Sequence, residues 1–515
     1  MSSKQLIRGT IILTTAGILT RILGFGYKIF LSNRIGAKGL GIYQLVFSVY
    51  VICHTIYCSG IQTVISKETA AIGNNHKNEQ VNFLFHALIL SLSAALFLSG
   101  IVYASSDFIA NRLLLEPECS VYIKTISFVF PFSAITCCIN GYHYGLKATK
   151  IPSACQLVEQ ILRITVVVII VFTGIPSVSR SCMLAVIGLI AGEIAACIFS
   201  CFTWKNPAGY ILHLSSKILM RVLPPSFLLT LNRLLINVLS TIESALIPYL
   251  LRCSGMTQSQ SLSVYGTLTG MSLPVILFPT AVSLAFSIML LPEISGAWAS
   301  GSVKKVTYTT DCVIALSAIT GVFSMCFFYV FGKDLGLLIY SSKSSGIYMH
   351  FLSLMSPFLY ISTSFSSILN GIDKTMSILI NSMISILLRI AVLILFVSDY
   401  GIMSFIYGLI ASQILLCILD YFSVKKSIPV NLFIFNDLVL PTLVCGILFG
   451  ITKRLYTLLV HHFEPDRIYS LVIIIIMSII SSYFAIRILL INKRFNTLTS
   501  SCHLDKFLFR NNRNS

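Results

Sequence analysis

The chain has 515 residues, of which 56% are hydrophobic and only 10% are charged. Soluble globular domains carry about 25% charged residues, so this composition excludes a protein whose main solvent is water. The apolar stretches are about 20 residues long, which is enough to cross a hydrocarbon core of about 30 Å as helices. The strict alternation of membrane barrel strands is absent. We therefore predict an all-α, polytopic membrane protein.

The formal net charge of +18 would also suit a nucleic-acid-binding protein. However, the basic residues lie in short loops and in the C-terminal tail, as the positive-inside rule expects for a membrane protein. The sequence has no hydrophilic domain that could hold a nucleic acid. Nucleic acid is therefore not expected as a partner.

Most of the 15 cysteines lie in apolar stretches. They do not form the paired CxxC motifs of a zinc site, and we predict no metal site and no cofactor. A cysteine in an apolar stretch usually behaves as a small buried hydrophobic residue. We predict this role, and no disulfide framework, for Cys53, Cys58, Cys137, Cys138 and Cys197.

Fourteen apolar stretches can be separated along the chain, and each is predicted to form one transmembrane helix. The N-terminal stretch carries Arg21 and lacks a small-residue cleavage site, so we interpret it as a retained helix and not as a signal peptide. The predicted spans are 9–32, 40–63, 82–104, 122–145, 152–174, 181–203, 226–251, 264–291, 311–331, 347–370, 375–397, 401–423, 436–458 and 468–491.

Two parts of the chain share residues at a constant offset of about 226 positions, which indicates a duplicated unit. Each copy contains six spans. Because six is an even number, both copies enter the membrane from the same side, and the repeat is predicted to be parallel. The matching residues are Pro131-Phe132, Gly145 and Leu162-Arg163-Ile164 in the first copy, and Pro357-Phe358, Gly371 and Leu388-Arg389-Ile390 in the second.

The repeat divides the chain into four predicted parts. Residues 1–210 form an N-terminal six-helix bundle, and residues 211–428 form a C-terminal one. Residues 429–492 add two helices outside the repeat, and residues 493–515 form a basic tail near anionic lipid headgroups. Lys and Arg are more frequent in the segments on the side of the termini. This bias predicts a multi-pass protein of the cell membrane with both termini in the cytoplasm.

Two of the predicted helices carry polar residues at intervals of three or four positions, which places these residues on one helix face. A charge at the middle of the bilayer costs at least about 2.5–3.5 kcal/mol. We therefore predict that both faces line a water-filled cavity. The alternative is that the cations extend to the membrane surface. The faces consist of Thr10, Thr14, Gly17, Arg21, Gly24 and Lys28 in the first span, and of Ser226, Thr230, Arg233, Asn237, Ser240 and Ser244 in the seventh.

The fifth span carries an acid–base pair. Glu159 and Arg163 are four residues apart on one helix face, with Gln160 beside them, and such a pair attracts. It could be a structural pair that neutralises itself or a part of the cavity, and both interpretations remain open. In the second copy Arg389 matches Arg163, but Ser385 stands in place of the acid. Arg389 therefore needs another partner, for which an anionic ligand is one candidate.

Two further acids, Glu193 and Glu243, fall inside predicted spans. Each could relay protons, bind a cation or neutralise a neighbouring arginine. Gln413 stands at the repeat position of Glu193, which argues against an obligatory proton role there. The sequence contains no Walker-type GxxxxGK[ST] segment and no HExxH or GxSxG motif. An enzyme is therefore not predicted.

Several short motifs are similar to those of the stage V sporulation protein B family. This family belongs to the superfamily of polysaccharide flippases and multidrug exporters. The resemblance covers nearly all fourteen spans, although His143-Tyr144 stands where the family pattern has Phe-Gln. The motifs are Gly39-Leu40-Gly41-Ile42-Tyr43-Gln44, Ser66-Lys67-Glu68, Val158-Glu159-Gln160 with Arg163, and the segment from Tyr265 to Pro274.

The resemblance implies a flippase for lipid-linked oligosaccharides, similar to the lipid II flippases. In those proteins a cationic cavity receives a pyrophosphate, and two extra helices form a groove for the lipid tail. Glu243 stands where the family often has Asp. The cavity residues expected to bind an anionic saccharide head are Arg21, Lys28, Arg163, Arg233 and Asn237, with Arg389 as a further candidate, and the residues expected to balance charge or couple transport are Glu159, Glu193 and Glu243.

The sequence leaves two other functions open. A cation-coupled multidrug antiporter of the same fold would need an acidic cavity, and the basic helix faces argue against it. A membrane scaffold for envelope-synthesis enzymes would tolerate Arg21→Ala and Arg233→Ala, whereas a flippase would not. Expected partners are therefore a lipid-linked anionic saccharide, membrane lipids and envelope-synthesis enzymes.

Overall fold

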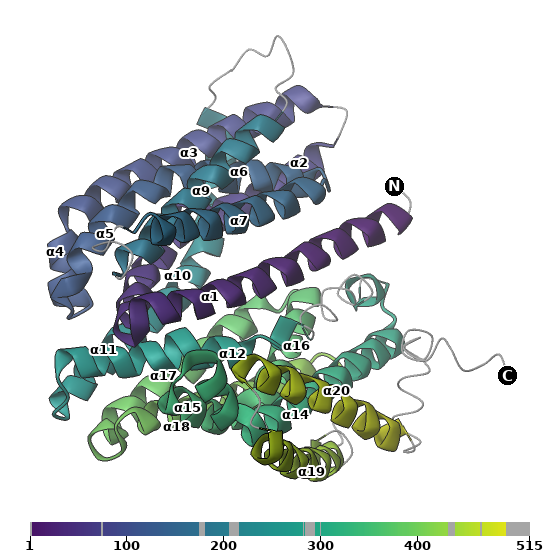
Figure 1. Ribbon diagram of the computed structural model, residues 1–515. Coiled ribbons are helices and arrows are strands. Elements are labelled where there is room, and N and C mark those ends of the chain that lie inside the picture. Colours follow the sequence, from purple (N-terminus) through teal and green to yellow (C-terminus); the bar gives the residue numbers. More distant parts are fainter. Residues whose placement is uncertain are drawn as a thin grey trace. The chain divides into compact units, whose positions relative to one another are not determined.

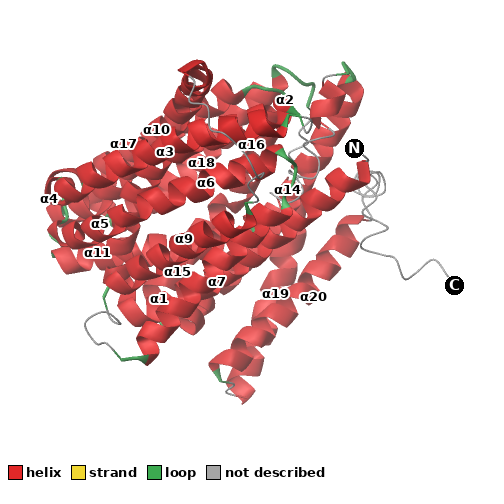
Figure 2. Ribbon diagram, turned by 90° about the horizontal axis from the view of Figure 1, so that it is seen from above, coloured by secondary structure: helices red, strands yellow, loops and turns green. Residues whose placement is uncertain are grey.

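The structure is a computed structural model that describes residues 3–73, 76–174, 181–204, 216–281, 283, 294–298, 300–430, 438–463 and 466–490. All regular elements within these ranges are helices (Figure 2). Twelve helical segments are long and apolar enough to cross a membrane. The first of them, Thr15–Ile72, contains two predicted spans, and the predicted span 264–291 lies partly outside the described ranges. The prediction of an all-α membrane protein with about fourteen helices is confirmed.

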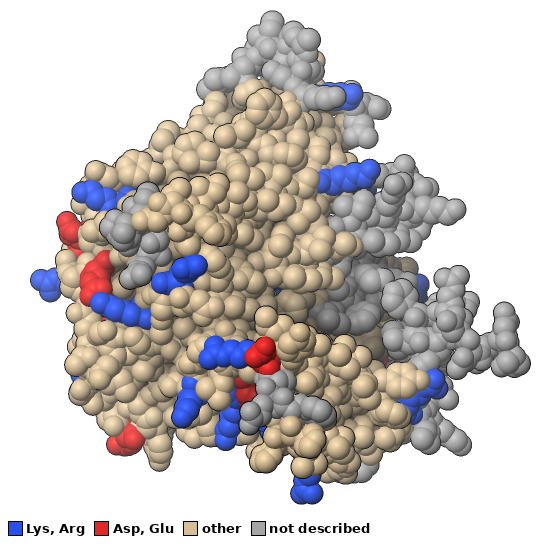
Figure 3. Space-filling model, viewed as in Figure 1, with Lys and Arg blue, Asp and Glu red and all other residues tan. Residues whose placement is uncertain are grey.

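The surface of the helices agrees with a lipid environment. Large apolar side chains are exposed along them, for example Ile475 and Ile479 near the C-terminus. Charged side chains are sparse on the face drawn in Figure 3. Exposed apolar area of this extent is rare in soluble monomers, and in lipid it carries no penalty.

The chain packs into two compact units. Unit 1 is Met1–Met271 with Ile390–Phe405, and unit 2 is Ser272–Arg389 with Ile406–Ser515. This division follows packing, whereas the predicted boundaries at 210, 428 and 492 follow the repeat and remain predictions. The predicted basic tail, 493–515, lies outside the described residues.

Unit 1 holds the first six predicted spans and the start of the second copy. Within it, α7 packs along α9, α6 packs against α2, α3 and α9, and α1 packs against α7, α10 and α11 (Figure 1). Its elements are α1 (Ser3–His54), η1 (Thr55–Ser59), α2 (Gly60–Ile72), α3 (Lys77–Ala104), α4 (Ser106–Phe108), η2 (Ile109–Leu113), η3 (Pro117–Cys119), α5 (Ser120–Ile126), η4 (Ser127–Val129), α6 (Phe130–Gly145), α7 (Lys150–Phe172), α9 (Met183–Thr203), α10 (Ser216–Cys253) and α11 (Gln258–Gly266).

The first two predicted spans form one long kinked helix followed by a π-helical turn. The kink in α1 is at Gly36, whose φ of 68° is open to glycine and costly for other residues. The π-turn η1 then joins α1 to α2. Gly60, the first residue of α2, faces the Ser226 carbonyl and the Thr230 hydroxyl of α10 at a distance that leaves no room for a Cβ. The missing side chain therefore allows α10 to contact α2 closely.

Unit 2 contains the rest of the second copy and the two additional helices. In it α14 packs against α15, α16, α19 and α20, and α19 packs against α20. A buried apolar cluster that includes Ile314, Phe365 and Val424 joins α14, α16 and α18. The elements are α12 (Leu273–Leu277), α14 (Val303–Tyr340), α15 (Lys343–Leu352), η6 (Ser353–Met355), α16 (Ser356–Gly371), α17 (Thr375–Tyr400), α18 (Ile402–Lys425), α19 (Leu440–Phe463) and α20 (Arg467–Leu490). The C-terminal part of α17 and the start of α18, Ile390–Phe405, belong to unit 1.

The repeat seen in the sequence recurs in local structure. In each copy a short α-helix leads into one 3₁₀ turn, η4 or η6, and then into a helix that carries proline in its first turn. Proline suits this place because its missing N–H would have no partner in a first turn. The two helices, α6 and α16, end at Gly145 and Gly371, which are repeat partners. The duplicated residues therefore encode duplicated helix boundaries.

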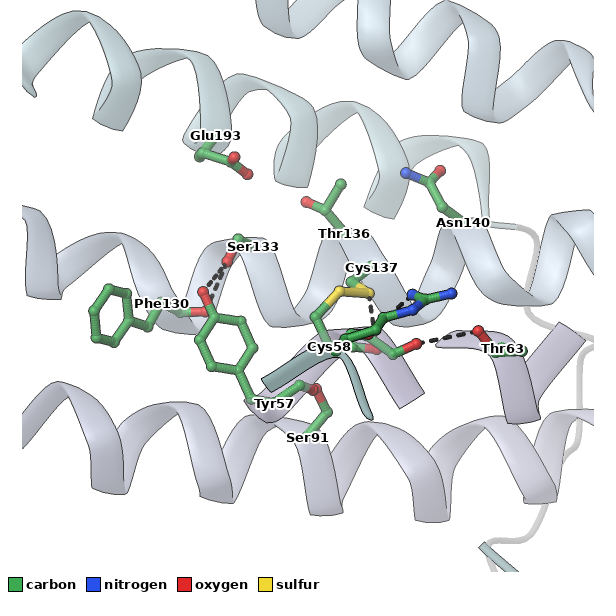
Figure 4. The surroundings of a disulfide bond; sticks show 12 residues. Tyr57, Cys58, Thr63, Ser91, Phe130, Ser133, Thr136, Cys137, Asn140 and Glu193 are labelled. Carbon is green, nitrogen blue, oxygen red and sulfur yellow. Dashed lines mark hydrogen bonds between the residues drawn. A yellow bond between two sulfur atoms is a disulfide. The ribbon is translucent and has the colours of Figure 1, made fainter. Parts of the chain in front are cut away.

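One prediction about the cysteines is wrong. Cys58 of η1 and Cys137 of α6 form a disulfide (Figure 4), although both lie in apolar stretches that gave no sign of pairing. The Tyr57 and Ser133 hydroxyls share a hydrogen bond of 2.6 Å beside it. The disulfide and this hydrogen bond attach η1 to α6. Twelve other cysteines within the described residues are free, and most of these are buried as expected.

Replacing Cys58 and Cys137 together by serine is expected to lower the free energy of unfolding by about 2–4 kcal/mol, because the disulfide closes a long loop in the unfolded chain. Thermal unfolding in detergent measures this loss. Cys138→Ser is the matched control, since it removes a buried thiol of α6 without breaking a bond. Reducing agent should destabilise the wild type and leave the double variant unchanged. Equal unfolding temperatures for the control and the double variant would contradict the prediction.

Candidate functional site

Three side chains of unit 1 that carry buried polar atoms form a group that we call the donor cluster: Tyr27 of α1 and Gln160 and Arg163 of α7. A Cβ placed on Gly24 of α1 would be 3.7 Å from Gln160 Nε2. A Cβ on Gly188 of α9 would be 2.8 Å from the Tyr27 hydroxyl and 3.5 Å from the Arg163 carbonyl oxygen. The cluster therefore lies where α1, α7 and α9 meet.

Each member of the donor cluster has a hydrogen-bond donor that no described residue accepts. These donors are the Tyr27 hydroxyl, Gln160 Nε2 and Arg163 Nε, all of them buried. A buried polar group without a partner costs about 1–3 kcal/mol, and such groups in native proteins usually serve water, an ion or a ligand. Three of them at one helix junction make this junction a candidate binding site.

The predicted i,i+4 pair of the fifth span is present at this junction. Arg163 Nη2 donates to Glu159 Oε1, and the side chains are 17% and 26% exposed. Arg163 also interacts electrostatically with Glu193 and Tyr43. Its guanidinium therefore faces two acids, while its Nε remains without an acceptor among the described residues.

Glu193 of α9 has a tyrosine as its hydrogen-bond partner. The Tyr50 hydroxyl of α1 donates to Glu193 Oε1 at 2.8 Å. Figure 4 shows Glu193 on the helix that runs beside the one carrying Thr136 and Cys137. The kinked helix α1 thus contacts this region twice, through Tyr27 before the kink and through Tyr50 after it.

The two predicted cations of α1 lie close to the donor cluster in sequence. Arg21 is exposed and Lys28 is half-buried, and neither forms a hydrogen bond or an ion pair with a described residue. Gly24, between them, is the residue that approaches Gln160. Arg21 and Lys28 are one turn from Gly24 on either side, on the same helix face. Thr10 and Thr14 belong to the same predicted face, but their side chains are outside the described part of the structure.

Arg233 and Asn237 of α10 contact the π-turn. Arg233 Nη1 donates to the Ser59 hydroxyl at 2.9 Å, and Asn237 Nδ2 donates to the Thr55 hydroxyl at 2.7 Å. A π-turn inserted between helices is often a functional position. Both residues were predicted to bind substrate, but in this conformation each uses a donor to hold η1. Arg233 is otherwise exposed and keeps further N–H groups for a ligand.

The remaining predicted residues lie elsewhere. Glu243, 4% exposed, is buried on α10 and interacts electrostatically with Tyr265 of α11. Arg389 is on α17 in unit 2, so its grouping with the cations of unit 1 remains a prediction. Ser385, at the repeat position of Glu159, donates to the Ser412 carbonyl at 2.8 Å.

Unit 2 has a buried acid that the sequence interpretation missed. Asp420 of α18 is fully buried and accepts hydrogen bonds from Asn381 Nδ2 at 2.8 Å and from the Ser366 hydroxyl at 3.5 Å. Asn381 Nδ2 also donates to Ser423. A lone acid within the predicted span 401–423 was the available signal.

A known protein family matches the N-terminal part of the chain. The family model described as polysaccharide biosynthesis protein matches residues 6–298. The chain belongs to the polysaccharide biosynthesis protein family. Both the donor cluster and the contact of α10 with η1 lie within this matched region.

Two curated relatives from Bacillus subtilis match this family member over most of its length. Stage V sporulation protein B is 24% identical over 452 residues, which are 84% of this chain and 86% of the relative. Lipid II flippase MurJ is 24% identical over 461 residues, which are 80% and 81% of the two chains. The resemblance to the sporulation protein family is confirmed.

Solved structures share the fold. Lipid II flippase MurJ in an inward closed conformation gives a TM-score of 0.71 at 16% identity, covering 93% of this chain and 99% of that one. A multidrug resistance transporter of the MATE family, in the MOP superfamily, gives 0.65 at 15% identity, covering 81% and 99%. At such low identity the likeness establishes the fold alone.

Proposed function

We propose that this member of the polysaccharide biosynthesis protein family is a transporter that moves a lipid-linked anionic saccharide from the inner to the outer leaflet of the cell membrane. The donor cluster is the observation that carries the proposal. Its three unsatisfied donors need an acceptor, and a phosphate or a saccharide head supplies several acceptor oxygens. Two relatives with comparable length, one of them named a lipid II flippase, support this class of substrate.

The charges near the donor cluster support an anionic head. Arg21 and Lys28 have no acid partner among the described residues, and Arg233 has donors left beyond its bond to Ser59. A pyrophosphate needs several cations, and the planar guanidinium suits its oxygens better than an ammonium does. Glu159 and Glu193 then balance Arg163 when the site is empty. They and Glu243 are the candidates for coupling to an ion or to the membrane potential.

Transport would follow the alternating-access scheme of duplicated membrane proteins, in which repeats rock about a fixed site. The head would enter from the cytoplasmic side, where both termini are predicted to lie. The proposed transporter has no enzyme activity. Envelope-synthesis enzymes that make or use the lipid are the expected protein partners.

A groove in unit 2 suits the lipid tail. This open groove has a volume of about 480 Å³ and lies between α14, α19 and α20. Phe323, Phe327 and Phe449 line one side, and Ile475, Ile479 and Ile486 line the other. The two helices outside the repeat, α19 and α20, line this groove together with α14, which supports the proposal that they hold the tail. An apolar chain gains about 0.8 kcal/mol for each CH₂ group that it buries.

Filling this groove is expected to weaken binding of long-chain substrates. Ser478→Trp places an indole in the groove, and Ile476→Trp places one on an exposed, lipid-facing position of the same helix as the control. The affinity for a long polyprenyl-pyrophosphate saccharide should fall about tenfold or more with Ser478→Trp only, because several CH₂ contacts are lost. A short-chain analogue should bind both variants alike. Equal long-chain binding by the two variants would remove the groove from the proposal.

Ligand-induced stabilisation of the purified protein tests the proposed substrate class. A ligand that binds the native state raises the unfolding temperature with its concentration. A polyprenyl-pyrophosphate saccharide should do so, whereas the neutral polyprenol and an organic drug cation should not. Stabilisation by the cation alone would favour a multidrug antiporter. No stabilisation by the anionic lipid at any concentration would contradict a flippase.

A further inference from the structure

A buried carboxylate joins two distant segments of unit 1. Glu116 lies between η2 and η3 and is fully buried. Arg252 Nη1, at the end of α10, donates to its Oε1 at 2.5 Å, and Gln258 Nε2, at the start of α11, donates to its Oε2 at 2.8 Å. Both carboxylate oxygens therefore bind the connection between α10 and α11. We call these three residues the clamp.

The backbone next to Glu116 also takes part. Arg252 Nη2 donates to the Leu115 carbonyl at 2.7 Å. Leu115 has a φ of 58°, in the left-handed region that residues other than glycine rarely adopt. Such strained positions persist where the surroundings hold them in place and are frequent at switch regions. The strain at Leu115 is held by the bidentate contact of one arginine with both Leu115 and Glu116.

The clamp connects the two copies of the repeat. Leu115 and Glu116 belong to the first copy, and Arg252 and Gln258 belong to the second. Arg221, near the start of α10, and Glu68, near the end of α2, form an ion pair of 2.7 Å. This pair and the clamp lie at opposite ends of α10. In the predicted topology the clamp is on the outer side and the Arg221–Glu68 pair is on the inner side.

We propose that the clamp is the outer gate of the transporter, closed in this conformation and released when α10 and α11 move away from the first copy to expose the head of the substrate to the outside. This inference rests on the proposed transport function. Opening would bring water to Glu116 and Arg252 and would free Leu115 from its strained conformation.

The energetics of the clamp suit a gate that opens repeatedly. A buried ion pair gains little net stability, because the cost of removing both charges from water offsets their attraction. Burial raises the pKa of Glu116 above its ordinary value, while Gln258, Arg252 and Lys38 act in the opposite direction. Removing these charges from water therefore opposes the closed, ionised clamp. Hydration on opening therefore compensates for the lost contacts.

A distance measurement tests the gate without any substrate. Spin labels are attached at Cys253 of the second copy and at Arg112→Cys of the first, both exposed, in a Cys201→Ser background. In lipid nanodiscs the protein with an intact clamp should give mainly one short distance. Glu116→Gln should raise the longer-distance population about tenfold, since it leaves the Arg252 charge of the closed clamp without its carboxylate partner. Arg252→Gln is the second variant and should act alike.

Glu118→Gln is the matched control. Glu118 is two residues from Glu116 and forms an exposed ion pair of 2.8 Å with Lys38. Glu118 and Lys38 both belong to the first copy. Exposed pairs contribute little, so this variant should keep the distances of the intact clamp. Unchanged distances in both Glu116→Gln and Arg252→Gln would overturn the gate. Because no substrate is added, this result is independent of whether the proposed substrate is right.

A cross-link provides the converse test. Glu116→Cys and Gln258→Cys are combined in a Cys201→Ser, Cys253→Ser background and joined by a short cleavable bifunctional thiol reagent. Linked protein should lose transport of the lipid-linked saccharide and regain it on cleavage, while binding in detergent persists. Transport that continues at the unlinked rate in fully linked protein would also overturn the gate.

Discussion

Arg163→Ala is expected to destabilise unit 1 by about 3 kcal/mol and to abolish substrate binding. Removing one member of a largely buried ion pair leaves the other charge uncompensated, which costs about 3–5 kcal/mol. The lower end applies because Glu159 is 26% exposed. Glu193 also loses the positive charge of Arg163, with which it interacts electrostatically. Thermal unfolding in detergent and lipid-induced stabilisation measure the two losses separately.

A neutral pair separates the structural role of Arg163 from its binding role. Glu159→Gln combined with Arg163→Gln keeps the size and polarity of both side chains and removes both charges. This double variant should recover most of the lost stability and should still fail to bind the anionic lipid. If it binds as well as the wild type, the pair is structural only. If Arg163→Ala itself is as stable as the wild type, the ion pair contributes nothing.

Tyr27→Phe combined with Gln160→Met is expected to weaken binding of the anionic lipid strongly without loss of stability. Neither removed donor has an acceptor among the described residues, so the fold loses no hydrogen bond from these two donors and is relieved of two buried unsatisfied groups. A hydrogen bond to a charged ligand group contributes about 1.5–3 kcal/mol, so each donor should change affinity about tenfold or more. The variant should unfold at or above the wild-type temperature.

The opposite pattern would identify the donor cluster as structural. In that case the double variant would lose stability and keep its affinity. Tyr43→Phe is a suitable control, because Tyr43 is a buried tyrosine of α1 near the same arginine and its hydroxyl is not one of the unsatisfied donors. It should leave the affinity of the protein for the lipid unchanged.

The membrane spans and the repeat could be predicted because they depend on local properties. Apolar length determines which segments enter lipid, and duplicated residues such as Pro131 and Pro357 begin duplicated helices. The pair of Glu159 and Arg163 was also predictable, since residues four apart on a helix always share a face. These inferences needed no knowledge of how helices pack against one another.

The composition of the site depends on packing between helices and could not be predicted. Tyr27 is one tyrosine in an apolar span, and only its approach to α9 at Gly188 shows that its hydroxyl is buried. Arg233 was recognised as a cation of the seventh span, but its bond to Ser59 requires the π-turn η1. The disulfide joins cysteines 79 positions apart, a separation that gives no sequence signal.

The two copies also diverge in ways that spacing alone does not reveal. The first copy places its acid, Glu159, beside Arg163. The second has Ser385 at that position and a buried acid, Asp420, on the next helix, held by Asn381. A duplicated backbone therefore supports different polar networks in the two copies.

Transbilayer movement of a polyprenyl-pyrophosphate-linked saccharide in proteoliposomes tests the central claim most directly. The experiment compares the wild type, the Tyr27→Phe, Gln160→Met variant and empty liposomes, under an imposed membrane potential and with ion gradients of either sign. Wild-type protein should move the lipid well above the empty control, and the folded variant should lose most of that movement. Wild-type movement no faster than in empty liposomes under every condition would contradict transport by this chain.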